Sequence, residues 1–460
     1  MKNAPSPSIH PLLHLLPGRL RYRVALGPRF LRDPLGFFTE SVREHGDIVA
    51  FSPGRIFLIN HPDYIKHVLQ DNHPNYRKGL EMTKMLQPFF GQGLLTSEGP
   101  LWLRQRRLAQ PAFHRRHSPE MMKLMTESTA AMLRRWDTTA GQFRERRDDL
   151  TELTLDILLK GLLGTDWGED PKGLMDAVLE LEEALALVSS FSDPFQPPLW
   201  LPTPRNRKIK HALEAADHWM YRLIASRRRN GNPGNDLLAL LMEARDADTG
   251  EGMSDRQLRD ELLTLLRTGH STLRELVLWT WYLFATNPEA EQRFYAEVDS
   301  VLGDRPPTYE DLPKLPFTLM AIHESMRLYP PAWVFVRAAL GDDEIGGFRI
   351  PAGAMVVMCP YVTQRSEEWW PDPEKFDPER FMPERSGNRP KFAYLPFGGG
   401  PRLCIGNNFA LMEAQVILAM VAQRFRLEVD PNHTLKRVLF VSMMAHNLWI
   451  KMLPRGQGVQ

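Results

Sequence analysis

The chain has 460 residues, of which 43% are hydrophobic, so it can bury a large core. Its 57 basic and 56 acidic residues leave a net charge of +1, which excludes a strong overall attraction to nucleic acid or to an anionic membrane. Two cysteines cannot build a disulfide framework, so we expect a reducing, cytoplasmic location. No linker composition divides the chain, and we predict one domain over residues 1–460.

The N-terminal part is predicted to begin with an extended, proline-marked lead-in over residues 1–35. It contains no apolar run of about 18 residues, so we expect no transmembrane anchor. A short helix is predicted over residues 36–46. Two apolar runs at 48–51 and 56–59 flank Pro53 and Gly54, a pattern typical of a β-hairpin.

The following third of the chain is predicted to be mostly helical. Residues 76–98 are expected to form a loop that is rich in large apolar side chains. Residues 118–164 and 171–188 favour helices, and the prolines within 189–204 indicate an irregular apolar loop.

The longest helical pattern begins after Ser254, which forms a capping box with Gln257, and continues to about Thr286. At 1.5 Å per residue this helix would be roughly 48 Å long, enough to cross the molecule. Gly269 lies near its middle. A glycine there costs about 0.5–1 kcal/mol relative to alanine, so it requires a reason.

The most specific segment is residues 397–406, where glycines precede a cysteine and an apolar helical pattern follows it. The segment fits Phe-x-x-Gly-x-Arg-x-Cys-x-Gly, through Phe397, Gly400, Arg402, Cys404 and Gly406. A helix N-terminus stabilises a thiolate, and glycines let the backbone approach a flat ring closely. A lone cysteine is more often a small buried hydrophobe, but the complete pattern favours axial ligation of a haem iron.

This segment resembles the haem-binding loop of the cytochrome P450 family, and further motifs of that family follow in the expected order between about residues 34 and 453. The resemblance is to soluble, bacterial-type members. It implies a mainly α fold with small β-sheets, in which haem b (iron protoporphyrin IX) lies between the long central helix and the cysteine loop. Cys404 would then be the ligand to the metal.

The resemblance also implies which side chains contact the cofactor. Trp102 and Arg106 stand four residues apart on a predicted helix and match a pair that binds a haem propionate; Arg337 matches a second propionate contact. Within the loop, the implied cofactor contacts are Phe397, Arg402, Cys404 and Gly406.

The long helix carries the implied oxygen site. Thr272 matches the hydroxyl that hydrogen-bonds the bound oxygen, and Gly269 would open a groove for it. The sequence departs from the family at Ser271, where an acid is usual. Glu275 lies one turn further, so a water could connect it to Ser271 in an altered proton path. The alternative is that the charges here reach solvent or pair with each other.

A second motif is Glu324-x-x-Arg327, followed by prolines and then by Arg380. Alone, such a pair is usually a surface salt bridge. By resemblance these three residues form one buried ion network, in which both guanidinium groups bind the carboxylate and hold the cysteine loop in place.

The substrate pocket is expected to be largely apolar. Residues 332–337 are predicted to form a strand over it, and 442–445 a hairpin that enters it; Cys359 is predicted to be a buried strand residue without a ligand role. The pocket residues implied are Leu86, Phe89, Phe90, Arg267, Thr268, Ala332, Trp333, Phe335 and Met443.

The predicted function is a monomeric monooxygenase that inserts one oxygen atom from O2 into a lipophilic small molecule. Electrons would come from a separate ferredoxin or flavodoxin, docked by basic residues that include Arg104, Arg107, Arg115 and Arg116. The alternatives are a peroxide-using or isomerising haem-thiolate enzyme, which Ser271 motivates, and a haem sensor without turnover.

Overall fold

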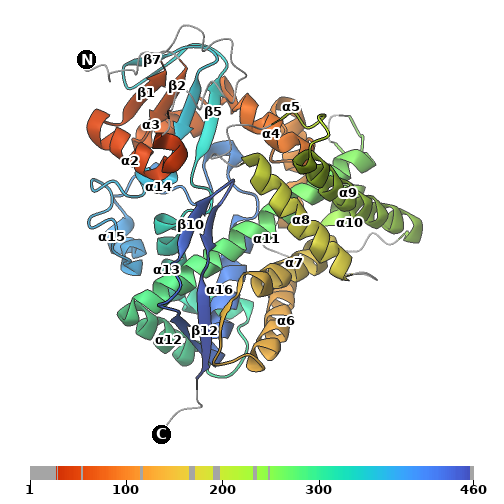
Figure 1. Ribbon diagram of the computed structural model, residues 1–460, viewed down its shortest axis with the longest axis vertical. Helices are drawn as coiled ribbons and strands as arrows, with labels where there is room; N and C mark the ends of the chain where they lie inside the picture. Colours follow the sequence, from red (N-terminus) through yellow and green to blue (C-terminus); the bar gives the residue numbers. More distant parts are fainter. Residues whose placement is uncertain are drawn as a thin grey trace.

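The computed structural model describes residues 27–455, apart from residue 28 and the segments 53–54, 114–117, 165–170, 190–196, 232–235 and 247–248. The predicted lead-in therefore falls mostly outside the described residues, as do Arg115 and Arg116. Figure 1 shows helices forming most of the structure, with the largest sheet gathered near the N-terminal end. The mainly α architecture with small sheets agrees with the prediction.

The α-helices are α2 (Pro34–His45), α3 (Pro62–Lys66), α4 (Leu80–Phe90), α5 (Gly99–Ala109), α6 (Ser118–Asp137), α7 (Arg147–Leu163), α8 (Pro171–Ser189), α9 (Pro204–Asn230), α10 (Leu237–Glu243), α11 (Asp255–Thr286), α12 (Pro288–Leu302), α13 (Pro316–Leu328), α14 (Pro360–Thr363), α15 (Pro383–Ser386) and α16 (Asn407–Arg424). The strands are β1 (Ile48–Ser52), β2 (Ile56–Ile59), β3 (Tyr76–Lys78), β4 (Phe143–Glu145), β5 (Phe335–Ala339), β6 (Asp343–Ile345), β7 (Phe348–Ile350), β8 (Met355–Met358), β9 (Phe425–Val429), β10 (Lys436–Leu439), β11 (Met443–His446) and β12 (Trp449–Pro454).

The five-stranded sheet has the order β1-β2-β8-β5-β3. β1 and β2 form the predicted hairpin, with Ile48 opposite Ile59. β2 runs parallel to β8, whereas β5 is antiparallel to both β8 and β3. The predicted C-terminal hairpin also forms, because β10 and β11 pair antiparallel.

α11 is the central element, and it contacts α7, α9, α13 and α16 (Figure 1). Its start is confirmed: the Ser254 hydroxyl accepts from the Gln257 backbone, and the Gln257 side chain accepts from the Ser254 N–H. Tertiary packing rather than propensity keeps so long a helix in place, since most of its residues are buried.

Four local predictions differ from the structure. Residues 76–98 are not a loop, because they contain β3 and α4; Leu86, Phe89 and Phe90 share one buried helical face despite Pro88. Residues 118–164 are two helices separated by Gly141, whose φ of +80° suits glycine, and by β4. The strand predicted over 332–337 begins later, at Phe335, and Cys359 follows β8 instead of lying in it, although it is buried.

Candidate functional site

The cysteine loop is held by backbone contacts. The Cys404 N–H donates to the Phe397 carbonyl at 3.0 Å, and α16 begins three residues later, at Asn407. Gly400 has a φ of +66°, and a Cβ there would collide with the Leu69 carbonyl, so only glycine fits. The loop therefore presents its cysteine at a helix N-terminus in a fixed conformation.

Cys404 has solvent-accessible surface, although many protein atoms lie around its sulfur. Burial raises the pKa of its thiol, while the Gly406 N–H and the charge of Arg106 lower it. Arg106 is held against the loop, since its guanidinium donates to the Leu403 carbonyl at 3.0 Å. An accessible sulfur in such a setting can bind a metal ion, and metal binding would remove the proton.

Predicted cofactor contacts gather beside this loop. The Arg402 guanidinium lies 4.2 Å from the centre of the Trp102 ring and binds the Glu98 carboxylate at 2.6 Å. Burial, followed by the charge of Arg402, lowers the pKa of Arg337 to about 10. The structure thus brings Trp102, Arg337 and Arg402 together from three separate segments.

Lys78 joins this cluster, and sequence reasoning missed it. Its ammonium group donates to the Leu95 carbonyl. Burial, followed by the charges of Arg402 and Arg337, lowers its pKa to about 7. No local pattern could have revealed Lys78, because its three-residue strand pairs with β5 only in the folded chain.

The cluster fits the propionate end of a haem. Glu98 binds Arg402 directly, and Glu261 acts on Lys78 through its charge, but burial raises the pKa of Glu261 to about 7. Three partly buried basic side chains therefore face too little negative charge, and such a set is costly unless anions balance it. Two propionate carboxylates would supply that charge.

α11 has a partly exposed stretch near its middle. Its central residues are buried except for Arg267, Thr268, Gly269 and Thr272, which are partly exposed. The Thr272 hydroxyl donates to the Thr268 carbonyl at 2.8 Å, and the Ser271 hydroxyl to the Arg267 carbonyl at 3.0 Å. Both hydroxyl groups therefore donate to backbone carbonyls of α11 itself.

The reason for Gly269 differs from the expected one. A Cβ at this position would lie 2.9 Å from a methyl group of Leu158 in α7, closer than real side chains approach. Gly269 therefore lets α7 and α11 pack closely, whatever space it also leaves on the exposed side of α11.

Glu275 does not face solvent, and the predicted water link to Ser271 is not supported. Its carboxylate is fully buried and binds Arg147 of α7 at 2.5 Å and Arg274 at 3.0 Å. It also accepts from the Ala445 N–H of β11 at 2.8 Å. Its oxygen atoms are thus committed to structural partners, which corrects its assignment as a proton relay.

Glu182 of α8 extends this charged cluster, and no sequence pattern predicted it. It binds His270 at 2.9 Å, Arg274 at 3.1 Å and Arg267 at 3.3 Å. Although burial raises the pKa of Glu182, the charges of Arg267 and Arg274 bring it well below its usual range. The charges on α11 therefore pair with α8 and α7 instead of reaching solvent.

The Glu324 network begins on α13. Arg327 binds both Glu324 oxygens, at 2.7 and 2.8 Å, and Arg380 approaches at 3.3 Å. Both guanidinium groups thus contact the carboxylate, as predicted, although the Arg380 terminal nitrogens donate to the Pro371 and Asp372 carbonyls. The network fixes the segment around Asp377, whose N–H donates to Glu324.

The predicted pocket residues divide into two groups. Ala332, Phe335, Arg267 and Thr268 are partly exposed, and Phe335 lies beside Gly398 of the cysteine loop. The larger apolar residues are instead buried in the core: Leu86, Phe89, Phe90, Trp333 and Met443. The Trp333 indole donates to the Phe440 carbonyl at 2.9 Å, so its polar end is satisfied there.

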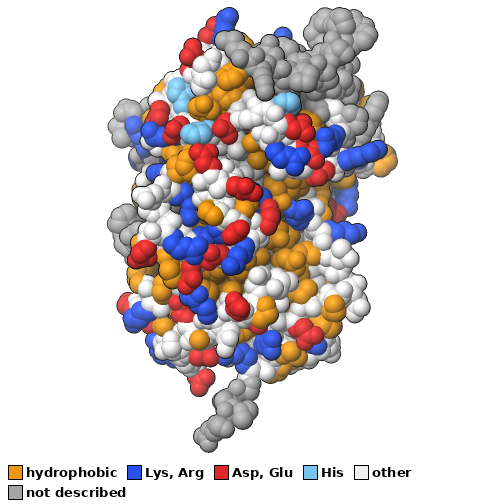
Figure 2. Space-filling model, turned by 90° about the vertical axis from the view of Figure 1, so that its left-hand side faces the viewer, with side chains coloured by type: hydrophobic (Ala, Val, Ile, Leu, Met, Phe, Trp, Pro, Cys, Tyr) orange, Lys and Arg blue, Asp and Glu red, His pale blue; other side chains and the backbone are white. Residues whose placement is uncertain are grey.

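Arg104 is not available for docking a partner. It binds Asp246 at 3.2 Å and donates to the Glu251 and Gly252 carbonyls. On the face shown in Figure 2, acidic and basic side chains are interspersed, so that face presents no single sign of charge.

The cysteine loop, the cation cluster and the open stretch of α11 define the class of haem-thiolate proteins. The match to known proteins is specific: the cytochrome P450 family model covers residues 27–448. The chain belongs to the cytochrome P450 family, and it is an oxidoreductase of the monooxygenase type.

Similar proteins cover nearly all of the chain. Cyclooctatin synthase of Streptomyces melanosporofaciens is 35% identical over 92% of this chain and 91% of its own. Cyclooctat-9-en-7-ol 5-monooxygenase of the same organism is 34% identical over 88% of this chain and 87% of its own length. The crystal structure of the cytochrome P450DA heme domain superposes with a TM-score of 0.85 at 27% identity, covering 98% and 97%. No helix among the described residues is long and apolar enough to span a membrane.

Proposed function

We propose that the protein inserts one oxygen atom from O2 into a lipophilic small molecule, using haem b bound through Cys404. The accessible Cys404 at the start of α16 carries this proposal. When bound, the haem activates oxygen, and a thiolate ligand favours O–O cleavage.

The chain's own residues would position the cofactor and the substrate. Lys78, Arg337 and Arg402 would bind the propionates, and Arg106 would keep the loop close to Trp102. Thr272 would hold a proton at its hydroxyl oxygen in the open stretch of α11. The buried apolar residues of α4 and α11 would exclude water from the groove.

Two observations support a lipophilic substrate. Phe335 offers partly exposed apolar surface beside Gly398 of the cysteine loop, and buried phenylalanines of α4 belong to the same apolar core as α11. The name of one Streptomyces relative refers to a cyclic alkenol, so we propose a terpenoid-like substrate. Electrons would come from a separate ferredoxin or flavodoxin.

Ser271, which stands where the family usually has an acid, favours a second candidate, the use of peroxide in place of O2 and reductant. Product formed with peroxide alone, at a rate matching the reductant-driven reaction, would select it. Product that requires both reductant and O2 would select the monooxygenase.

The test of this proposal replaces Cys404, the residue proposed to bind the haem iron. We expect the reduced, carbon monoxide-treated protein to show the absorption band of a thiolate-bound haem, and Cys404→His to lose that band while still binding haem. Cys359→His is the matched control, because Cys359 is buried and donates to the Trp333 carbonyl. An unchanged spectrum in Cys404→His would overturn the proposal.

A further inference from the structure

Charge is unbalanced in the cluster that joins α7, α8 and α11. It contains the guanidinium groups of Arg147, Arg267 and Arg274 and the carboxylates of Glu182 and Glu275. His270 brings no carboxylate to the cluster, and its two ring nitrogens face acceptors, the Leu266 carbonyl at 2.7 Å and the Glu182 carboxylate at 2.9 Å. One positive charge in the cluster has no carboxylate of its own.

The unbalanced charge belongs to Arg267. Arg274 donates to Glu275, Thr151 and Glu182, and Arg147 holds both oxygens of Glu275. Arg267 has only a 3.3 Å ion contact with a Glu182 oxygen that His270 already occupies at 2.9 Å. The buried Nε of Arg267 has no hydrogen-bond partner. Arg147 also has an unpartnered Nε, but its terminal nitrogens bind both Glu275 oxygens, whereas Arg267 has no such paired contact.

Arg267 also lies in the right place to meet a substrate. It belongs to the partly exposed stretch of α11 that includes Thr268 and Thr272. Five residues of helix place it about 7.5 Å along the axis from Thr272. α8 and α4 both contact this part of the structure, and Figure 1 shows α8 passing beside α11 near α4. A cation thus lies on the partly exposed stretch of α11, beside the apolar residues of α4 and α8.

We propose that Arg267 binds a carboxylate of the substrate, so the substrate class is a lipophilic acid oxidised at a carbon remote from its acid group. This inference rests on the proposed function. A planar guanidinium with a free N–H edge can bind a carboxylate through paired hydrogen bonds. Glu182 competes for the same cation and so sets the strength of binding.

The test uses the haem-loaded protein and two matched pairs of probes, dodecanoic acid with 1-dodecanol and abietic acid with abietinol. Binding is read from the shift in haem absorption. We expect at least one acid to bind about tenfold or more tightly than its alcohol. Arg267→Gln should abolish this preference without weakening the alcohol, and Arg267→Lys should retain part of it.

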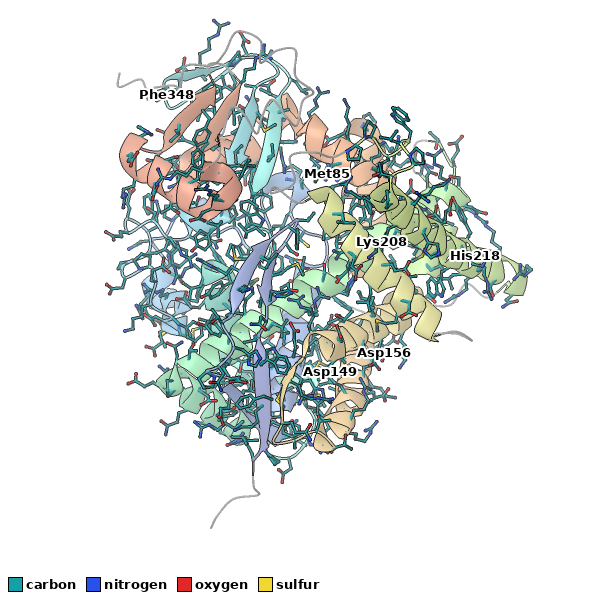
Figure 3. All side chains as sticks on the ribbon, in the orientation of Figure 1. Met85, Asp149, Asp156, Lys208, His218 and Phe348 are labelled. Atoms are coloured by element: carbon teal, nitrogen blue, oxygen red, sulfur yellow. The ribbon has the colours of Figure 1, made fainter. Side chains whose placement is uncertain are left out.

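Glu182→Gln supplies an independent measurement. Removing the competing carboxylate should raise the affinity for the acid probes and leave the affinity for the alcohol probes unchanged. Glu183→Gln is its matched control: the neighbouring Glu183 is exposed and pairs with Lys208 of α9, labelled in Figure 3. Glu183→Gln should change neither affinity.

The outcomes separate this inference from the proposed function. Equal binding of acids and alcohols in the natural protein would overturn the inference and leave the lipophilic monooxygenase standing. No shift with any of the four probes would overturn both. If Arg267→Gln fails to load haem, Arg267→Lys and Glu182→Gln decide, and unchanged acid affinity in both would overturn the inference.

Discussion

Lys78 shows how a single residue can serve a cofactor site from a distant strand. Its ammonium group lies among Arg337, Arg402 and Glu98, and its low pKa reports burial beside other cations. A buried cation of this kind is stabilised mainly by an anion placed next to it.

We predict that Lys78→Met weakens haem binding by about 10- to 100-fold, the value of a lost charged hydrogen bond of about 1.5–3 kcal/mol. The measurement is the rate and extent of haem transfer to a competing haem-binding protein. Lys84→Met on the exposed side of α4 is the control. Equal haem retention in both variants would remove Lys78 from the site.

At the scale of elements, the Glu324 network fastens α13 to the segment that follows α14. Glu324 and Arg327 are fully buried, and Arg327 also donates to the Gln364, Pro373 and Lys375 carbonyls. One ion pair thus connects α13 to three carbonyls of a long irregular segment.

Glu324→Ala should lower the free energy of unfolding by about 3–5 kcal/mol, because it leaves two buried cations without their carboxylate. Denaturant unfolding of the haem-loaded protein measures this change. The exposed Glu384→Ala should have almost no effect. Normal stability in Glu324→Ala would mean that the carbonyl contacts suffice.

His323, the neighbour of Glu324 on α13, makes the protein sensitive to acid. Burial lowers its pKa from 6.5 to about 4. Below pH 6.5 the unfolded chain takes up this proton first, so stability is full above pH 6.5 and falls between pH 6.5 and 4. The loss approaches about 3 kcal/mol at the lower end.

The variant His323→Gln should flatten that part of the pH profile. The measurement is the free energy of unfolding between pH 4 and pH 7 for both proteins. His73→Gln, on the exposed short turn before β3, is the control and should keep the slope of the natural protein. Parallel profiles for His323→Gln and the natural protein would contradict the assignment.

At the scale of the molecule, the Glu275 cluster joins parts that are remote in the sequence. Its carboxylate binds α7 through Arg147 and β11 through Ala445, while Arg274 reaches α8 through Glu182. The central helix is therefore connected by charge to three elements around it.

Glu275→Gln should destabilise the whole fold by about 3–5 kcal/mol, since Arg147 and Arg274 would lose their shared anion. Thermal and denaturant unfolding measure the loss, with the exposed Glu289→Gln as the control. A variant that keeps full stability but forms less product per reductant consumed would instead restore Glu275 as a proton relay.

Local pattern alone predicted much of this protein. The glycine-rich cysteine loop, the capping box of α11 and the β1–β2 hairpin each depend on residues that are neighbours in the chain, where turn chemistry and periodicity act directly. Resemblance to a family, not local pattern, predicted Trp102, Arg337 and Arg402 as cofactor contacts, and the fold brings these three side chains together.

Only the tertiary structure decided which charges are free and which are paired. Lys78, Glu98 and Glu182 reach their sites from β3, the start of α5 and α8, and no spacing within one segment reveals such neighbours. The same holds for Gly269, whose requirement comes from Leu158 on another helix. A buried charge takes its role from the partners that folding brings to it, because the interior leaves no water to replace them.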